Sequence, residues 1–379
     1  MVHYFPDETT HGWNHSILPF AATLISKIVV SASGDQSIHG FFLETPSGQP
    51  MSKVITMSCN EKKEWQRTIL SQDVERLLDN VVSLERFTDH QKRDHIYGVS
   101  VIGPEFKAFI LTYNQGQWEI GFETKVERGD KVFLVDGFNA FDFTLIRLTY
   151  QRKYHFRFGN NNNGRISFTR EKPLVTEVTD EFENKEEPLN NKVIDIFPLL
   201  SKRHNGIAPE RFSIAMKSRT FMVQLTFDGQ LNFSSTILNN PSRGWSPLNV
   251  EEVSCGADRN GFPVILASNM KKDKTFMLNS NELLGGIPIM NKRWFLLGEN
   301  LKNFAIPAHL TNGFEAFLVQ QDGSLVLTVK DENDESYHDQ LIASPHESKD
   351  TVHAPSHCIE IVAFNEKELG APARPLQIR

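Results

Sequence analysis

The sequence predicts an all-β protein, a β-propeller of seven blades with six as the alternative. Apolar runs rich in β-branched and aromatic residues are interrupted seven times by short turn-like breaks. From Gly48 to Gly323 these breaks recur at a mean interval of about 55 residues, which is a spacing typical of propeller blades. Helical patterns are sparse. The breaks are Ser47-Gly48, Gln115-Gly116, Gln151 to Lys153, Asp228-Gly229, Lys271 to Asp273, Asp322-Gly323 and Glu366 to Gly370.

The strongest individual elements are hairpins, in which two alternating runs flank a turn. Asp228-Gly229 is expected to form a tight primed turn, because Asp-Gly tolerates the positive φ angles that such turns need. A pair of β-sandwiches would also explain the density of strands, but not their regular recurrence. The expected pairs are 38–44 with 54–57, 106–113 with 118–124, 221–227 with 230–234, and 314–320 with 324–329.

Shorter apolar strands precede or follow these hairpins, and we expect some of them to be the innermost strands of their blades. They are 97–102, 132–136, 212–216, 264–267 and 359–364. His39 and His95 each stand at the start of an apolar strand, so on this interpretation their imidazoles face the mouth of a channel.

Outside the strands, one helix is expected within Ser71 to Leu84, with Ser71 as its N-cap. The acidic segment Glu177 to Asn191 is expected to be a solvated loop. Residues 1–370 are interpreted as a single propeller domain and residues 371–379 as a C-terminal tail.

Composition excludes several classes of protein. The 379 residues carry a formal net charge of −7 with no dominant basic stripe, so no nucleic-acid partner is expected. The three cysteines, Cys59, Cys255 and Cys358, are far apart and form no CxxC pair, so we expect three reduced thiols and no metal site. No cofactor-binding motif occurs. Residues 17–28 lack a basic head and are too short for a membrane span, which favours a cytoplasmic protein with no membrane partner, with secretion as the alternative.

The region from Phe221 to Val264 carries a resemblance to a known family. It combines the hairpin around Asp228-Gly229 with Arg243-Gly244-Trp245-Ser246 and with Asp258-Arg259-Asn260-Gly261 before an apolar strand. In this it resembles one repeat of the propeller lectins of bacteria and fungi, and Phe314 to Val329 resembles part of a second repeat. The resemblance implies a propeller fold and recognition of a glycan.

Seven residues are candidates for a ligand site. Asp136 and Asp142 flank a bend, and their carboxylates would face one cavity; Arg147 lies in an apolar strand and would need one of them as its partner. Trp118 and Trp245 are candidates for stacking on a sugar ring. The complete set is His39, His95, Asp136, Asp142, Arg147, Trp118 and Trp245.

Three functions remain open. The first is a lectin-like binding module for a glycan or another small molecule, which the absence of nucleophile motifs favours. The second is a cofactor-independent enzyme of the cyclase or pericyclase type with a single central pocket. The third is a scaffold for a protein partner. A cavity where His, Arg and carboxylate groups converge would favour the enzyme over the lectin.

Overall fold

The structure is a computed structural model of the 379-residue chain. It describes residues 2–6, 13–18, 25–32, 38–45, 51–60, 62–89, 93–151, 153–162, 164–174, 195–199, 209–217, 222–238, 250–257, 262–269, 273–284, 287–290, 294–306, 314–330, 337–344, 360–364 and 374–378. These residues divide into two compact units. The first comprises residues 1–69, 252–279 and 295–379, and the second comprises residues 70–251 and 280–294.

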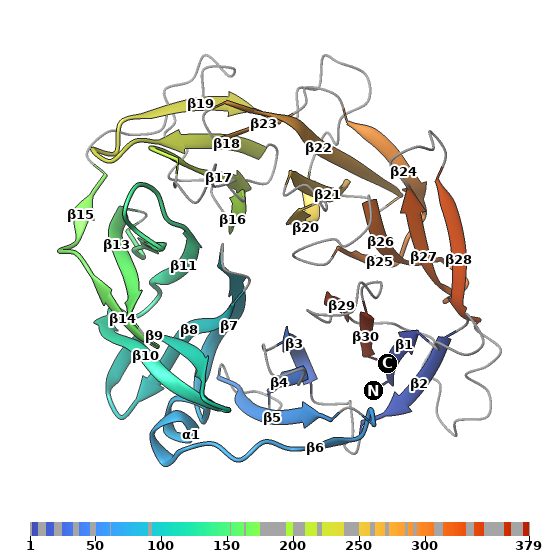
Figure 1. Cartoon of the computed structure of the whole chain (residues 1–379), viewed down its shortest axis with the longest axis horizontal. Coiled ribbons are helices and arrows are strands. Elements are labelled where there is room, and N and C mark those ends of the chain that lie inside the picture. The colour runs from blue at the N-terminus through green and yellow to red at the C-terminus, as the bar shows by residue number, and fades with distance from the viewer. Residues whose placement is uncertain are drawn as a thin grey trace. The chain divides into compact units, whose positions relative to one another are not determined.

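The fold class is that of a β-propeller, as predicted. The strands of the described residues form seven sheets of four or five strands, and in six of them the sequence-adjacent strands pair in order along the chain (Figure 1). Consecutive meanders of four strands are the repeating element of propellers. Whether residues 1–370 behave as one domain stays a prediction.

The first unit contains three whole sheets and most of a fourth. Their orders are β3-β4-β5-β6, β25-β26-β27-β28, β2-β1-β30-β29, and β20-β21-β22 with β24 on β22. The strands are β1 (Val2–Pro6), β2 (Trp13–Ile17), β3 (Ile25–Ala32), β4 (Ile38–Glu44), β5 (Lys53–Cys59), β6 (Trp65–Arg67), β20 (Val250–Ala257), β21 (Pro263–Asn269), β22 (Lys274–Leu284), β24 (Phe295–Glu299), β25 (Asn303–Ala305), β26 (Phe314–Val319), β27 (Leu325–Lys330), β28 (His338–Ala343), β29 (Glu360–Phe364) and β30 (Arg374–Ile378).

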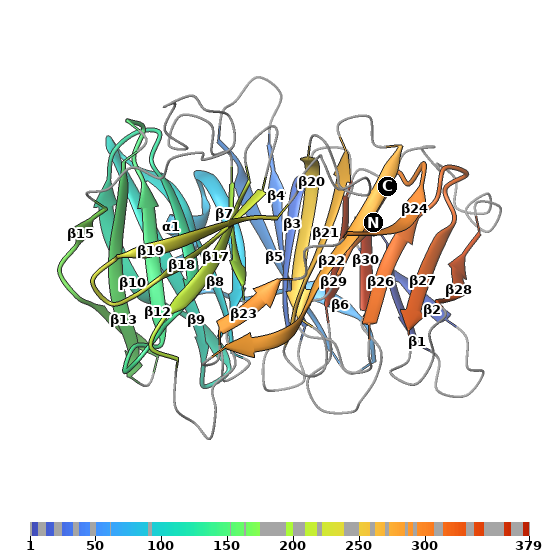
Figure 2. The same ribbon diagram turned by 90° about the horizontal axis from the view of Figure 1, so that it is seen from above.

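The second unit contains three sheets in chain order, β7 to β10, β11 to β14 with β15 on β13, and β16 to β19, which can be followed in Figure 2. Within it, β23 pairs with residues 280–284 of β22. The strands are β7 (Val81–Thr88), β8 (Asp94–Ile102), β9 (Glu105–Asn114), β10 (Gln117–Val126), β11 (Lys131–Asp136), β12 (Phe143–Leu148), β13 (Tyr154–Asn162), β14 (Arg165–Phe168), β15 (Lys172–Pro173), β16 (Asp195–Leu199), β17 (Phe212–Lys217), β18 (Met222–Phe227), β19 (Phe233–Ile237) and β23 (Ile287–Met290).

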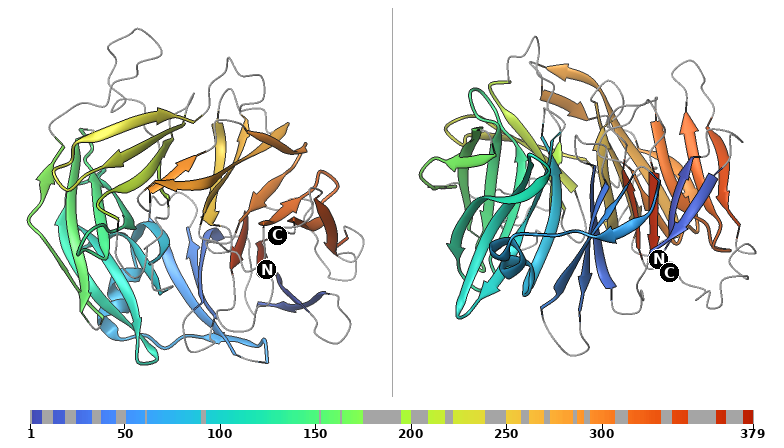
Figure 3. Two further views of the ribbon diagram at one scale, coloured as in Figure 1. Left: turned by 45° about the horizontal axis from the view of Figure 1, so that its top comes forward. Right: turned by 60° about the horizontal axis from the view of Figure 1, so that its bottom comes forward.

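One sheet of the first unit contains strands from both ends of the chain. β1 pairs antiparallel with β30, Val2 opposite Gln377 and His3 opposite Leu376, and the N and C marks lie together in Figure 3. Residues 374–378, expected to be part of a frayed tail, are therefore a strand that is paired on both sides.

The turns show why the hairpin prediction worked and where it failed. Gln115 and Gly116 both have positive φ, 49° and 84°, so the β9–β10 connection is the two-residue primed turn. The Asp228-Gly229 turn is different. Its positive φ of 67° belongs to Leu231, and the Asp228 carboxylate accepts the backbone N–H groups of Gln230 and Asn232 at 2.8 and 2.9 Å. Asp228 thus stabilises a longer loop through its side chain rather than through positive φ.

The predicted helix, expected to be of one or two turns, is present. α1 spans Gln72–Leu78, and the Ser71 hydroxyl accepts a hydrogen bond from the Val74 backbone N–H, as expected of an N-cap. Residues Val81 to Leu84, which were included in the helical prediction, begin strand β7. No helix in the described ranges is long and apolar enough to cross a bilayer.

Phenylalanine fills the core of the second unit. Phe138, Phe156, Phe158, Phe212 and Phe227 belong to one buried cluster, with ring centroids 4.8 to 6.3 Å apart in its contacting pairs. Such rings fill the space between two sheets without needing a polar partner. Cys59 and Cys255 each carry a reduced thiol, as predicted, and Cys358 lies outside the described residues.

Candidate ligand-binding pocket

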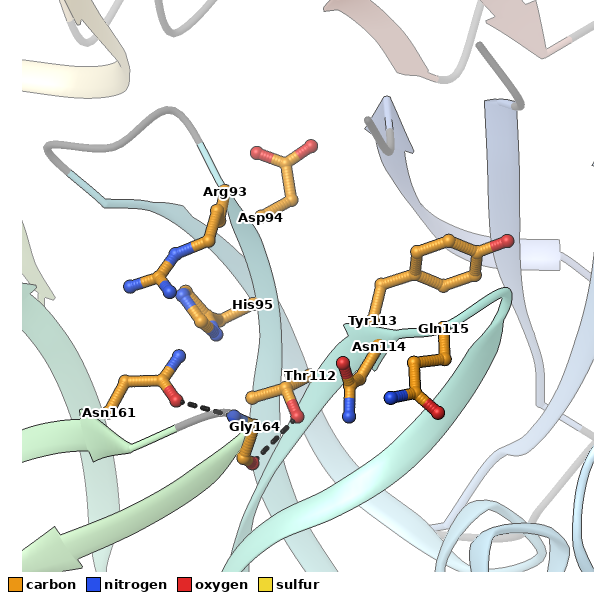
Figure 4. Close-up of a pocket in the computed structure, with 9 residues that line it drawn as sticks. All are labelled: Arg93, Asp94, His95, Thr112, Tyr113, Asn114, Gln115, Asn161 and Gly164. Carbon is orange, nitrogen blue, oxygen red and sulfur yellow. Dashed lines mark hydrogen bonds between the residues drawn. The ribbon is translucent and has the colours of Figure 1, made fainter. Parts of the chain in front are cut away.

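A polar pocket of about 350 Å³ opens in the second unit, where the ends of strands β8 and β9 meet the turn between β13 and β14. Three chain segments form its walls: the entry to β8, the end of β9 with its primed turn, and the β13–β14 turn (Figure 4). The lining residues are Arg93, Asp94, His95, Thr112, Tyr113, Asn114, Gln115, Asn161 and Gly164.

Gly164 fixes the β13–β14 turn against β9. Its φ of +91° favours glycine, and a Cβ there would lie 3.0 Å from Asn114 Nδ2. The Gly164 N–H donates to Asn161 Oδ1 at 2.9 Å, and the Thr112 hydroxyl donates to the Gly164 carbonyl at 3.0 Å. The first bond closes the turn, and the second holds the turn against β9, so that one hydrogen bond joins two walls of the pocket.

Asp89, which is not among the lining residues, holds two of them, Arg93 and His95. Its side chain is fully buried. Oδ1 accepts the Arg93 backbone N–H at 2.8 Å, while Oδ2 accepts Arg93 Nε at 2.7 Å and lies 3.1 Å from His95 Nε2. Burial raises the pKa of Asp89, but the hydrogen bond and charge of His95 and those of Arg93 outweigh it and lower the pKa to about 2. Asp89 is therefore a carboxylate at neutral pH.

His95 is held rigidly in this arrangement. Its ring packs edge-to-face on Phe143 at 4.9 Å and parallel to Phe87 at 6.5 Å, and the residue is 1% exposed. With Nε2 directed at the Asp89 carboxylate, Nδ1 is buried and makes no hydrogen bond to any described residue. A buried polar atom without a partner is costly, so Nδ1 marks a place where a ligand group would be stabilising.

Of the seven predicted residues, His95 lines this pocket and two others lie near it. Asp142 Oδ2 accepts the Asn161 backbone N–H at 3.0 Å, so Asp142 positions the turn that carries Asn161. Asp136, 6% exposed, lies opposite Phe143 in the β11–β12 register, and Phe143 contacts His95. Asp142 is engaged by the backbone of the turn, and the expectation that the two carboxylates face one cavity stays a prediction.

Arg147 belongs to a different cluster. Its guanidinium donates to Glu171 at 2.9 Å through both Nε and Nη2, and to Asp130 at 3.0 Å through Nη1. The expectation of Asp136 or Asp142 as its partner was wrong, because both lie at the other end of the β11–β12 pair. Burial lowers the pKa of Arg147, but the hydrogen bonds and charges of Glu171 and Asp130 outweigh it and raise the pKa.

The remaining predicted residues do not contribute to this pocket. His39 lies in the first unit on β4, 5% exposed. β4, β8 and β12 are each paired on both sides, so His39, His95 and Arg147 are not on innermost strands as expected. Trp118 is 3% exposed and packs on Tyr113 at 5.3 Å, which leaves no indole face for a sugar. Trp245 and the segment Glu177 to Asn191 lie outside the described residues.

Asp89, Arg93 and Asn161 were missed by the sequence analysis. Asp89 belongs to a turn type that recurs in the chain. In each case a side-chain oxygen accepts a hydrogen bond from the backbone N–H four residues later. The accepting residues are Asn60, Asp89, Thr149 and Asp228. These turns depend on a short polar residue rather than on glycine. They can be recognised in the sequence only when the position of the first turn residue is already known. No group of metal-ligating side chains occurs in the part of the chain that the structure describes.

Comparisons with known proteins give distant similarities. No protein-family model matches the chain, and no curated protein matches it. One similar solved structure is the SapL1 lectin in complex with alpha methyl fucoside. Its sequence is 9% identical to this chain, the alignment covers 86% of this chain and 99% of the lectin chain, and the TM-score is 0.47. A Penicillium chrysogenum alpha-L-arabinanase complexed with arabinobiose has 10% identity, coverages of 92% and 99%, and a TM-score of 0.43. The WD40 domain of SCAP from fission yeast has 12% identity, coverages of 86% and 71%, and a TM-score of 0.44.

Proposed function

We propose that this protein is a binding module that holds a small hydroxylated ligand, such as one sugar unit of a glycan, in the pocket between β8, β9 and the β13–β14 turn. The observation that carries the proposal is the pocket itself, about 350 Å³ in volume and walled by hydrogen-bonding side chains from three segments. That volume is at the lower end of the range for small-molecule sites, which suits a single ring better than an extended ligand.

The chemistry of the walls suits hydroxyl groups. Asn114, Gln115 and Asn161 present planar amides, and Arg93 presents a planar guanidinium. Each of these groups can address two neighbouring hydroxyl groups at once, because its polar atoms lie in one plane. The walls are preorganised by hydrogen bonds at Gly164 and Asp89, so binding would order few side chains.

A cofactor-independent enzyme is the second candidate. The observation that favours it is the convergence of Arg93, His95 and the Asp89 carboxylate, the combination of groups that we expected of an enzyme rather than a lectin. A carboxylate that orients an imidazole is the arrangement of a general base. However, the one hydroxyl-bearing aliphatic side chain in the lining, Thr112, donates to the Gly164 carbonyl. A binding role needs no nucleophile, so we place it first. For the scaffold alternative, the acidic segment 177–191 would offer a contact surface, and it lies outside the described residues.

The test is a screen of monosaccharides by saturation-transfer NMR, followed by calorimetry on the compounds that bind. Gln115→Ala and Asn161→Ala should each weaken binding about 10-fold, the loss expected for one or two hydrogen bonds. Gln117→Ala is the matched control: Gln117 is exposed on the neighbouring strand and does not line the pocket, so its loss should leave the affinity unchanged.

Two results would contradict the proposal. One is an absence of binding across the screen. The other is binding that survives Gln115→Ala and Asn161→Ala but is lost in Trp245→Ala, since Trp245 belongs to the lectin-like segment and not to this pocket.

A further inference from the structure

We infer that the ligand of this pocket carries a carboxylate, and that the two Nη groups of Arg93 bind it. The inference rests on the proposed function and specifies its ligand class as an acidic sugar or a similar small hydroxy acid. The argument comes from the hydrogen bonds that the pocket walls leave unused.

Arg93 presents a free edge of its guanidinium. Nε is occupied by Asp89 at 2.7 Å, and the side chain is 39% exposed. Neither Nη atom donates a hydrogen bond to any residue in the described parts of the chain. In Figure 4 the guanidinium lies beside the His95 ring and faces Asn161. Two parallel N–H donors on one edge match the two oxygens of a carboxylate.

Asn161 adds a donor on the opposite wall. Its Oδ1 accepts the Gly164 N–H at 2.9 Å, which fixes the orientation of the amide. Nδ2 therefore has its two hydrogens available, and it donates to no described residue.

The two carboxylates next to Arg93 and His95 in the chain, Asp89 and Asp94, are already engaged. Both Asp89 oxygens accept from Arg93 or lie against His95. Asp94 Oδ1 accepts the Thr88 hydroxyl at 2.6 Å, and its carboxylate points away from Arg93 and Asn161 in Figure 4. The two walls that carry Arg93 and Asn161 thus have an excess of donors, and a group that only accepts hydrogen bonds satisfies them best. An ionised carboxylate is such a group.

Asp89 explains how Arg93 can serve a ligand. The buried Asp89 carboxylate accepts hydrogen bonds from Arg93 Nε and from the Arg93 backbone N–H. These bonds fix the plane of the guanidinium and leave its two Nη groups for a ligand. A guanidinium fixed in this way loses little rotamer freedom when a ligand binds. Arg93 is therefore the specificity-determining residue of the pocket, and Asp89 is its positioning residue.

The experiment compares sugars that carry different groups at C6, namely methyl glucoside, methyl glucuronide and glucose 6-sulfate, each titrated by calorimetry. We expect methyl glucuronide to bind about 10-fold more tightly than methyl glucoside, the gain for a charge-assisted pair. Arg93→Gln should abolish this preference. Arg128→Gln, which removes the same charge from an exposed turn outside the pocket lining, should retain it.

Asn161→Asp is the second variant, and it decides the question if Arg93→Gln fails to fold. It keeps the acceptor for Gly164 but replaces the donor by a negative oxygen, so it should reduce the preference for glucuronide over glucoside at least as strongly. Equal binding of glucoside and glucuronide by the wild type would overturn the inference while leaving the proposed function intact. Tighter binding of glucose 6-sulfate than of the glucuronide would overturn it in favour of a tetrahedral oxyanion. Failure of all three sugars, together with the wider screen, would overturn both.

Discussion

Replacing Asp89 by Asn should destabilise the protein by about 2 kcal/mol at pH 7. Folding lowers the pKa of this carboxyl from 3.8 to about 2. Each unit of pKa change corresponds to about 1.4 kcal/mol of differential interaction, so the ionised carboxylate contributes about 2 kcal/mol. Asn has nearly the same shape but no charge, and the change therefore removes this contribution while disturbing the packing of Phe87 and Phe143 little.

The pH dependence gives the sharper test. Because the folded pKa lies below the unfolded one, the stabilisation is complete above about pH 5 and is lost as the pH falls toward 2. The difference in unfolding free energy between wild type and Asp89→Asn should therefore shrink to about 1 kcal/mol near pH 3. Urea unfolding, followed by tryptophan fluorescence at pH 7, 4 and 3, measures it.

A control separates this effect from a general loss of charge. Glu127→Gln removes an exposed carboxylate from the turn between β10 and β11 and should change stability by less than about 0.5 kcal/mol at every pH. The reasoning would be refuted by a difference between wild type and Asp89→Asn that does not vary from pH 7 to pH 3. A difference no larger than that of the control would refute it as well.

Two further predictions concern other positions. Gly98→Ala should lower the free energy of unfolding by about 3 kcal/mol, because its Cβ would lie 2.0 Å from the Ser83 carbonyl oxygen. Gly103→Ala should lower it by about 1 kcal/mol, because no atom lies within 4 Å of its Cβ and only the φ of +59° is unfavourable. Urea unfolding compares the two variants, and equal losses of stability would contradict the steric argument. Arg147→Met should lower the free energy of unfolding by about 3 kcal/mol, because it leaves the fully buried Asp130 without its cation. It should not alter ligand affinity at the pocket. Unchanged stability together with weakened binding would instead place Arg147 in the ligand site.

Strand positions could be predicted from the sequence because each depends on local pattern. The strand over Ile38–Glu44 has the predicted bounds, and the Gln115-Gly116 turn joins two strands where a hairpin was predicted, since alternation and turn residues act over a few positions. The Asp228-Gly229 turn failed for a related reason: two turn geometries share the same dipeptide, and the side-chain bonds of Asp228 select the longer one.

The pocket could be predicted only in part, because its walls come from separate segments. His95 was identified because it is a polar residue at the start of an apolar strand. Arg93 and Asn161 carry no such local signal, and they meet across the β7–β10 sheet and the β13–β14 turn only after both have folded. Arg147 was correctly expected to need an acidic partner, but strand register rather than sequence proximity selected Asp130 and Glu171.

The pairing of β1 with β30 has a consequence for biosynthesis. β1 ends at Pro6 and β30 begins at Arg374, so at about 5–20 residues per second the first strand waits roughly 20–75 s for its partner to be translated. During that time β1 and β2 form at most an isolated hairpin, which is marginally stable and exposes an unpaired edge. The β7–β10 sheet has no such delay, since all of its strands lie between Val81 and Val126. We therefore expect ribosome-bound chains to acquire protease resistance in the β7–β10 region early, and in β1 and β2 only once residues 374–378 have emerged from the ribosome.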